Sequence, residues 1–277
     1  MTFDLLTIFG LLASTLIGIS LGLIGGGGSI LTVPVLVYLF NVDPVLATAY
    51  SLFIVGLSSL VGAFPKYKAG MIDLKTALVF GIPSIIAVFF TRKILVPAIP
   101  ATLFDLGGIS ITKALAMMIL FAVLMVAASV SMIRDKKTEE SESNEARVFN
   151  YPMILLEGTV VGVLTGLVGA GGGFLIIPAL VMLSKLPMKQ AVGTSLLIIA
   201  AKSLIGFTGD VSENASKMDW TLLIVVTILA IIGIFIGNNL SKKINGAALK
   251  KGFGWFVLVM GIYIIIKELA FPGASSH

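Results

Sequence analysis

Long apolar segments recur through the whole chain, and they limit its fold more than any other feature. Several approach the roughly 20 residues that a helix needs to cross a bilayer core about 30 Å thick. They cover residues 5–24, 29–40, 44–64, 74–92 and 112–133, and then 151–168, 174–184, 190–208, 220–240 and 252–266. Only 12% of the residues are charged, too few to cover a water-facing surface, since a soluble domain carries about 25%. Lipid offers no partners for backbone groups, so each segment should be a helix. The sequence therefore predicts an all-α polytopic membrane protein.

A charged run divides these segments into two sets of five. The run Arg134–Arg147 is rich in charge and poor in apolar residues, which is typical of a solvated linker. Met1–Asp4 contains no positive charge, so the first segment is not predicted to be a cleaved signal peptide. We expect a first membrane repeat over residues 1–133, a linker over 134–150 and a second membrane repeat over 151–277.

The two sets of segments are related to each other. The run GISLGLIGGGGSILTVPVLVYL, which begins at Gly18, aligns without gaps with GVLTGLVGAGGGFLIIPALVML, which begins at Gly162. An Ala-x-x-x-Ser-Leu element follows at the same offset, starting at Ala47 and at Ala191. This similarity is well above chance, so the two halves should share one fold.

The basic residues indicate how the two halves are oriented. If the second half is inverted relative to the first, 13 of the 19 Lys and Arg residues lie on one side and five on the other, with Lys202 inside the membrane. A parallel arrangement divides them evenly, which the positive-inside rule disfavours. We therefore expect two inverted repeats in a bacterial inner membrane, with the linker over 134–150 cytoplasmic and both termini outside. Inverted repeats recur among transporters.

Each half carries a glycine cluster deep inside apolar sequence, at Gly25–Gly28 and Gly169–Gly173. Glycine costs about 1 kcal/mol relative to alanine in a helix interior, so each cluster should break its helix and begin a short helix, with three spanning helices after it. A helix start presents unpaired N–H groups and the positive end of a dipole, and glycine lets the backbone approach an anion closely. Paired breaks of this kind point to a transporter's binding site. We expect an anion site near the bilayer midplane that contains Gly26, Gly27, Gly28, Ser29, Gly171, Gly172 and Gly173.

Close helix packing through small residues is the alternative explanation for glycine in membrane helices. We favour it for the isolated pairs with a four-residue spacing. These pairs are Gly18 and Gly22, Gly162 and Gly166, and Gly233 and Gly237.

Hydroxyl groups and one lysine lie close enough in sequence to complete the site. Ser51, Thr194 and Ser195 come early in the helices after the short ones, where their hydroxyls could face the glycines or bond their own helix. Lys202 lies within the apolar run LLIIAAKSLIGF, where a charge costs at least about 2.5 kcal/mol. It either neutralises a bound anion or snorkels to the outer interface. Both alternatives stay open at this point.

Three further polar residues are candidates for coupling or for the transport path. Glu157 could carry a proton, although its position near the predicted cytoplasmic end favours an interfacial carboxylate. Asn238 and Asn239 follow a glycine near another helix end, where they could line the path or cap the backbone.

Missing residue types limit the chemistry. The chain has no Cys, and its only His is His277, so thiolate metal sites and His-based catalysis are excluded. We predict no catalytic residue, no metal and no cofactor. The net charge of +5 fits basic cytoplasmic loops, and we expect no nucleic-acid partner.

Two stretches of the second half resemble the sulfite exporter TauE/SafE family. They are GLVGAGGGFLIIPALVMLSKLPMKQAVGTSLL, from Gly166, and KMDWTLLIVVTILAIIGIFIGNNLSKKI, from Lys217. The first half repeats the pattern in weaker form, so the resemblance covers nearly the whole chain. It implies an anion permease that exports sulfite or an organosulfonate such as sulfoacetate. The first half departs from the pattern at Ala49-Tyr50, where the second half has Gly193-Thr194, so the resemblance does not imply a symmetric threonine contribution.

Together these features predict a secondary transporter that exports a small anion, a sulfur oxyanion or an organosulfonate. An anion channel of the same architecture is the alternative, because the sequence does not show whether the site opens to both sides at once. An intramembrane enzyme is a third hypothesis, and the lack of a catalytic His, a Cys or a Ser-centred elbow argues against it. The expected partners are the small-molecule anion and the lipid bilayer, with homo-oligomer formation left open.

Overall fold

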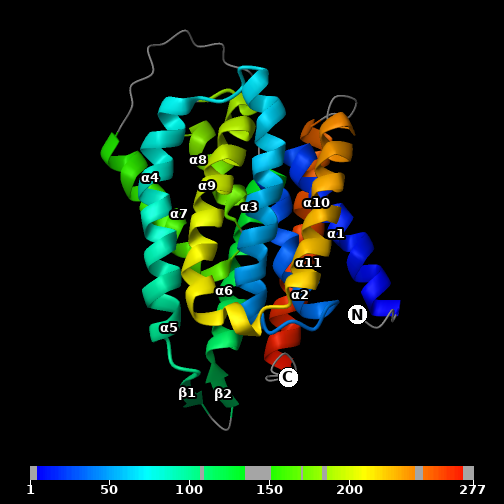
Figure 1. Cartoon of the computed structure of the whole chain (residues 1–277), viewed down its shortest axis with the longest axis vertical. Coiled ribbons are helices and arrows are strands. Elements are labelled where there is room, and N and C mark those ends of the chain that lie inside the picture. Colours follow the sequence, from blue (N-terminus) through cyan, green and yellow to red (C-terminus); the bar gives the residue numbers. More distant parts are fainter. Residues whose placement is uncertain are drawn as a thin grey trace.

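The computed structural model is a bundle of long helices that stand side by side (Figure 1). It describes residues 5–106, 109–134, 151–169, 171–182, 186–240 and 246–270. Apart from Arg134, the predicted linker over 134–150 lies outside these residues, as do the loop lysines Lys185, Lys242 and Lys243.

Each half contains a first long helix, a short helix after the glycine cluster and three further long helices, and the first half also contains a β-hairpin. The first half contains α1 (Leu5–Ile24), the 3-10 helix η1 (Gly26–Leu31), α2 (Thr32–Tyr38), α3 (Pro44–Lys68), α4 (Leu74–Phe90), the π-helical turn η2 (Thr91–Leu95), α5 (Val96–Ala98), β1 (Thr102–Leu106), β2 (Ile109–Thr112) and α6 (Lys113–Arg134). The second half contains α7 (Tyr151–Val168), α8 (Gly173–Met182), α9 (Met188–Asn214), the 3-10 turn η3 (Ala215–Lys217), α10 (Trp220–Leu240) and α11 (Gly246–Ala270).

This architecture confirms the prediction of an all-α polytopic membrane protein. Six helices are long and apolar enough to cross a membrane: Thr7–Ile24, Pro44–Lys68, Leu74–Ala98, Lys113–Arg134, Lys189–Val211 and Trp220–Leu240. The sequence did not predict the short antiparallel hairpin formed by β1 and β2 between α5 and α6.

Aspartate side chains fix where three of the helices begin. In each case the carboxylate accepts a backbone N–H two or three residues further on, which replaces a hydrogen bond that the first turn of a helix lacks. The pairs are Asp43 with Val45 and Leu46 at α3, Asp73 with Thr76 at α4, and Asp219 with Leu222 at α10.

Exposed apolar side chains form stripes along the outer helices. On α4, Leu78, Ile82, Ile86 and Phe90 recur every fourth residue, and each is more than half exposed. Residues four apart lie on one face of a helix, so these side chains form a continuous apolar surface. Lipid tails can cover such a surface, whereas water cannot do so without a large cost in free energy.

The helices pack crosswise between the halves. The first helix of each half lies along a later helix of the other half, α1 against α10 and α7 against α4, while α3 and α9 pack together. Small residues make these contacts close: a Cβ atom on Gly22 would lie 2.7 Å from the backbone nitrogen of Asn238, and one on Gly162 would lie 2.6 Å from the carbonyl oxygen of Ser84. The packing interpretation of the spaced glycine pairs is therefore confirmed.

Corresponding helices of the two halves run in opposite directions in the view of Figure 1. The chain rises along α3 and descends along α9, and it descends along α4 and rises along α10. The turn between α3 and α4 lies at the upper end of the bundle, whereas the β1–β2 hairpin lies at the lower end.

Candidate functional site

The two glycine breaks meet inside the bundle. Gly26, the first residue of η1, and Gly173, the first residue of α8, are both buried and pack backbone against backbone. A Cβ atom on either residue would overlap the Cα atom of the other. The breaks of the two halves therefore form one contact, which we call the glycine junction, and which only residues without a side chain can make.

The second break brings polar groups to this junction. Gly171 and Gly172 have φ angles of 62° and 68°, a conformation that residues with a side chain rarely adopt. A Cβ atom on Gly171 would lie 3.5 Å from Cβ of Ser29, whose hydroxyl donates a 2.7 Å hydrogen bond to the carbonyl oxygen of Gly26. A Cβ atom on Gly172 would lie 2.6 Å from Nζ of Lys202. The first turn of α8, with the positive end of its dipole, starts at the same place.

Lys202 is enclosed by protein about halfway along α9, and its exposed fraction is 0%. Its ammonium group donates a 2.9 Å hydrogen bond to Oγ1 of Thr165 on α7. It forms no ion pair with any carboxylate in the described part of the chain. Snorkelling would leave the amine at the surface, so that alternative is wrong. The protein instead holds a buried amine beside the glycine junction, and no carboxylate of the described residues forms an ion pair with it.

The predicted hydroxyl residues of α3 and α9 make other contacts. Oγ1 of Thr194 accepts a 2.9 Å hydrogen bond from the backbone N–H of Asp73, in the turn before α4. The hydroxyl of Ser195 donates to the carbonyl oxygen of Val192 in its own helix, at 2.9 Å. Ser51 is fully buried, and its hydroxyl has no hydrogen-bond partner among the described residues. None of these contacts joins the three hydroxyls to the glycine junction.

Gly28 lies on the side of η1 towards α1, whereas Gly25 faces Val192 of α9 and Ile177 of α8. A Cβ atom on Gly28 would lie 2.7 Å from the backbone carbonyl carbon of Ser20, so Gly28 allows η1 to pack on α1. Gly27 lies between Gly26 and Gly28 within η1. Gly26 is the residue of the first cluster that the structure shows against Gly173.

The candidates for coupling or path residues lie apart from the junction contacts. Glu157 is partly buried in the second turn of α7, and its Oε2 atom has no hydrogen-bond partner within the described residues. The backbone of Asn238 packs on Gly22, three residues before the first break, whereas Asn239 is exposed. Of these three residues, Asn238 is the one whose backbone contacts the helix that leads into the first break.

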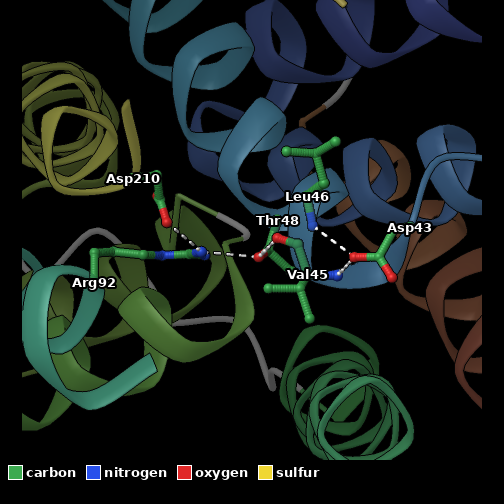
Figure 2. A network of polar contacts seen from close by, with 6 residues as sticks. All are labelled: Asp43, Val45, Leu46, Thr48, Arg92 and Asp210. Carbon is green, nitrogen blue, oxygen red and sulfur yellow. Dashed lines mark hydrogen bonds and ion pairs between the residues drawn. The ribbon is translucent and has the colours of Figure 1, made fainter. Parts of the chain in front are cut away.

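A buried ion pair is the main polar feature that the sequence analysis missed. Nη1 of Arg92, in η2, lies 3.5 Å from Oδ1 of Asp210 on α9 and donates a 2.9 Å hydrogen bond to Oγ1 of Thr48 on α3 (Figure 2). The exposed fraction of Arg92 is 1%. Arg92 is one of the five basic residues that the inverted arrangement counts on the side opposite the linker. The helix continues past Arg92, and the residue faces the interior of the protein instead of a water-exposed loop.

A sequence signal for this pair was present. Apolar residues resume directly after Arg92-Lys93, so the charge sits inside the 25-residue span Leu74–Ala98. Asp210 likewise lies within the span Lys189–Val211. Charges inside apolar spans usually pair with one another. Thr165 carried no comparable signal, because a single hydroxyl in an apolar helix is common.

Comparison with known proteins supports a transport role. Residues 10–264 match the family described as Sulfite exporter TauE/SafE. The "Probable membrane transporter protein YunE" of Bacillus subtilis (strain 168) is 31% identical over 296 residues, which cover 100% of both chains. A "Probable membrane transporter protein" of Xylella fastidiosa (strain Temecula1 / ATCC 700964) is 28% identical over 262 residues, which cover 92% of this chain and 93% of the relative. No solved structure matches the chain. These names describe membrane transporters and not enzymes, and the chain belongs to the sulfite exporter TauE/SafE family.

Proposed function

We propose that the protein is a secondary transporter that exports a small oxyanion across a bacterial inner membrane, with the anion bound at the glycine junction. The observation that carries this proposal is Lys202, a fully buried ammonium group with one hydrogen bond and no ion-pair partner among the described residues. An uncompensated charge at such a place costs several kcal/mol. A bound anion would supply the missing counter-charge.

The groups around Lys202 suit a compact oxyanion. The first N–H groups of α8 lack partners within their own helix. The hydroxyls of Ser29 and Thr165 donate to the carbonyl oxygens of Gly26 and Gly162 in this state, so each would have to rotate to donate its one hydrogen bond to an anion. Sulfite and the sulfonate group of sulfoacetate carry three oxygens around one sulfur, so they can accept hydrogen bonds from several directions at once. The family name supports the same class of substrate.

An inverted arrangement of the two halves would allow access to alternate between the two sides of the membrane. The opposed directions of α3 and α9 and of α4 and α10 support this arrangement. The distribution of basic residues supports a cytoplasmic linker and outside termini. Ser29, Thr165 and Lys202 are each at most 1% exposed, so the proposed site is closed to both sides in this state, as a transporter requires between its two open states.

Flux measurements on reconstituted protein test the proposal. Purified protein in liposomes should move radiolabelled sulfite and sulfoacetate with saturable kinetics. Lys202→Met should reduce this flux at least about tenfold, because the counter-charge is lost, and Lys202→Arg should retain part of it, because the charge survives with altered geometry. Lys189→Met is the matched control, since Lys189 lies on the same helix but is exposed. Undiminished flux in Lys202→Met would remove the residue from the site.

The same liposomes distinguish the transporter from the two alternatives. An anion channel would give a current that grows with voltage and exceeds about a thousand ions per second, well above the turnover of most carriers. An enzyme would convert sulfoacetate to another compound, whereas a transporter returns it unchanged. A saturable flux of intact substrate without such a current supports the proposed function.

A further inference from the structure

A second basic cluster lies on α9 beyond the glycine junction. Asp210 follows Lys202 by eight residues on the same helix, about 12 Å along its axis at 1.5 Å per residue. A cavity of about 350 Å³ lies there, and its lining includes Arg92, Lys113, Lys217, Asp43 and Asp210. We call it the outer cavity, because it lies next to η2 and η3, at the end of the bundle that carries the β1–β2 hairpin.

The guanidinium group of Arg92 is only partly used by the protein. Nη1 donates to Thr48 and faces Asp210, but Nε and Nη2 have no hydrogen-bond partner among the described residues (Figure 2). Structural pairs between arginine and a carboxylate are often bidentate, with distances of about 2.7–2.9 Å. The single contact of 3.5 Å between Arg92 and Asp210 does not reach that geometry. Nε and Nη2 form one edge of the guanidinium, which matches two oxygens of one oxyanion.

The charges that line the outer cavity leave an excess of positive charge. Arg92, Lys113 and Lys217 are basic, whereas Asp43 and Asp210 are acidic. The carboxylate of Asp43 already accepts two backbone N–H groups at the start of α3. An anion that enters the cavity therefore meets more positive than negative charge.

The outer cavity is also connected to the glycine junction. Thr48, which accepts the hydrogen bond from Arg92, packs against Gly169: a Cβ atom on Gly169 would overlap the backbone of Thr48. Gly169 is the residue at which the second glycine break begins. A movement of this break would therefore displace Thr48, which accepts the hydrogen bond from Arg92.

We propose that the outer cavity is a second anion site, in which the guanidinium group of Arg92 turns its Nε–Nη2 edge, enclosed in this state, towards the cavity and binds two oxygens of a sulfonate or sulfur oxyanion, while Asp210 competes with that anion for Arg92. The site rests on the proposed function only for the class of anion; its geometry is independent of Lys202. The anion would occupy it on the outer side of the glycine junction, one step away from Lys202 along α9.

Cysteine reactivity tests the outer cavity without any measurement of transport. The chain has no Cys, and Leu46 lines the cavity and is partly buried. A Leu46→Cys protein should react faster with an anionic methanethiosulfonate reagent than with a cationic one, and sulfoacetate should slow both reactions. Leu103→Cys, exposed on the hairpin at the same end of the bundle, is the control and should show neither the preference nor the protection.

Two substitutions then separate an anion site from a structural ion pair. Arg92→Gln should slow the anionic reagent and speed the cationic one, so it should lower the ratio of anionic to cationic reactivity at least about tenfold, because a unit positive charge is removed from the lining of the cavity. Asp210→Asn should raise that ratio and strengthen protection by sulfoacetate, because the competing carboxylate is gone. A purely structural pair predicts that both substitutions disturb the cavity alike. Changes in the same direction, or no protection by sulfoacetate in either Leu46→Cys or Asp210→Asn, would overturn the inference.

The Lys202→Met substitution, added to the Leu46→Cys protein, distinguishes a failure of this inference from a failure of the proposed function. Protection of Leu46→Cys by sulfoacetate should persist in Lys202→Met, because the outer cavity does not use Lys202. Loss of flux in Lys202→Met with protection retained supports both sites. Loss of protection in Lys202→Met would mean that one site explains all binding, and the second site would be rejected while the first stands. If Arg92→Gln does not reach the membrane, Asp210→Asn decides alone: a higher ratio of anionic to cationic reactivity with stronger protection supports the second site, and an unchanged or lower ratio rejects it.

Discussion

Tyr50 on α3 and Thr194 on α9 hold equivalent backbone groups in the two halves. The hydroxyl oxygen of Tyr50 accepts the N–H of Asp219, before α10, and Oγ1 of Thr194 accepts the N–H of Asp73, before α4. The two positions align in the repeat, at the offset that relates Gly18 to Gly162. Each hydroxyl thus joins a helix of one half to the start of a helix in the other. The sequence difference at this position changes the side chain but keeps the contact.

This contact predicts a structural effect for Thr194. In Thr194→Val the N–H of Asp73 loses its acceptor, which should lower the free energy of unfolding by about 1–3 kcal/mol and leave the affinity for sulfite unchanged. Denaturant unfolding in detergent and a binding titration measure the two quantities. Thr208→Val is the control, because Thr208 is exposed and bonds its own helix. Weaker sulfite binding without a loss of stability would instead place the Thr194 hydroxyl in the anion site.

Because Gly26 and Gly173 are in backbone contact, we expect that even a methyl group is too large at either residue. Gly26→Ala and Gly173→Ala each introduce a Cβ atom onto the opposite Cα atom, so η1 and α8 must move apart, and sulfite flux should be abolished. Gly252→Ala is the matched control, because an added Cβ atom there has no neighbour within 4 Å, and its flux should equal that of the wild type. Size-exclusion chromatography of the detergent-solubilised variants shows in parallel whether each protein is folded and monodisperse. Full flux from a well-folded Gly173→Ala protein would contradict a tight junction.

Most helices could be predicted from the sequence, because length and apolar content dictate where a chain can cross lipid. The predicted segments 5–24, 151–168 and 220–240 agree with α1, α7 and α10 to the residue. The paired glycine breaks and the short helices after them were also predicted, since glycine runs disfavour helix at any depth. The β1–β2 hairpin was missed, because a short loop outside the apolar segments carries little signal of strand pairing.

The sites were harder to predict, because side-chain direction depends on packing between distant helices. The sequence left Lys202 undecided between binding and snorkelling, and the answer depends on Thr165 and Gly172, which belong to α7 and the break after it. The apolar residues on both sides of Arg92 were a sequence signal that its charge lies within a span. The direction of its side chain was not predictable, because Arg92 lies in the π-helical turn η2, whose local geometry departs from that of an α-helix.

Labelling of single cysteines tests the orientation that we propose for the halves. Ala69→Cys, in the exposed turn after α3, and Ser141→Cys, in the linker, should both react only from the cytoplasmic side. Phe104→Cys, exposed on β1 at the opposite end of the bundle, should react only from outside. Membrane-impermeant maleimide applied to whole cells and to inverted vesicles measures this. Labelling of Ala69→Cys and Phe104→Cys from the same side would contradict the spanning arrangement, and labelling of Ala69→Cys from outside would contradict its orientation.

Lys202 also predicts opposite effects on stability with and without the anion. In the absence of substrate, Lys202→Met should raise the free energy of unfolding by about 1–3 kcal/mol, because a buried charge without a counter-ion is removed and the methionine stem fills nearly the same space. A ligand that binds the folded state adds about 2.7 kcal/mol at 100 times its dissociation constant. Wild type should therefore gain stability with saturating sulfite, whereas Lys202→Met should gain little.

Thermal unfolding in detergent, with and without sulfite, measures both effects in one experiment. Lys202→Arg keeps the charge, so it should remain responsive to sulfite even if its affinity is lower. Lys189→Met should follow the wild type in both conditions, since Lys189 is exposed. If Lys202 instead served to hold α9 to α7 through Thr165, Lys202→Met would be less stable than the wild type without sulfite and would gain as much from sulfite as the wild type does. That pair of results would assign the residue to packing and leave the start of α8 as the source of positive potential at the glycine junction.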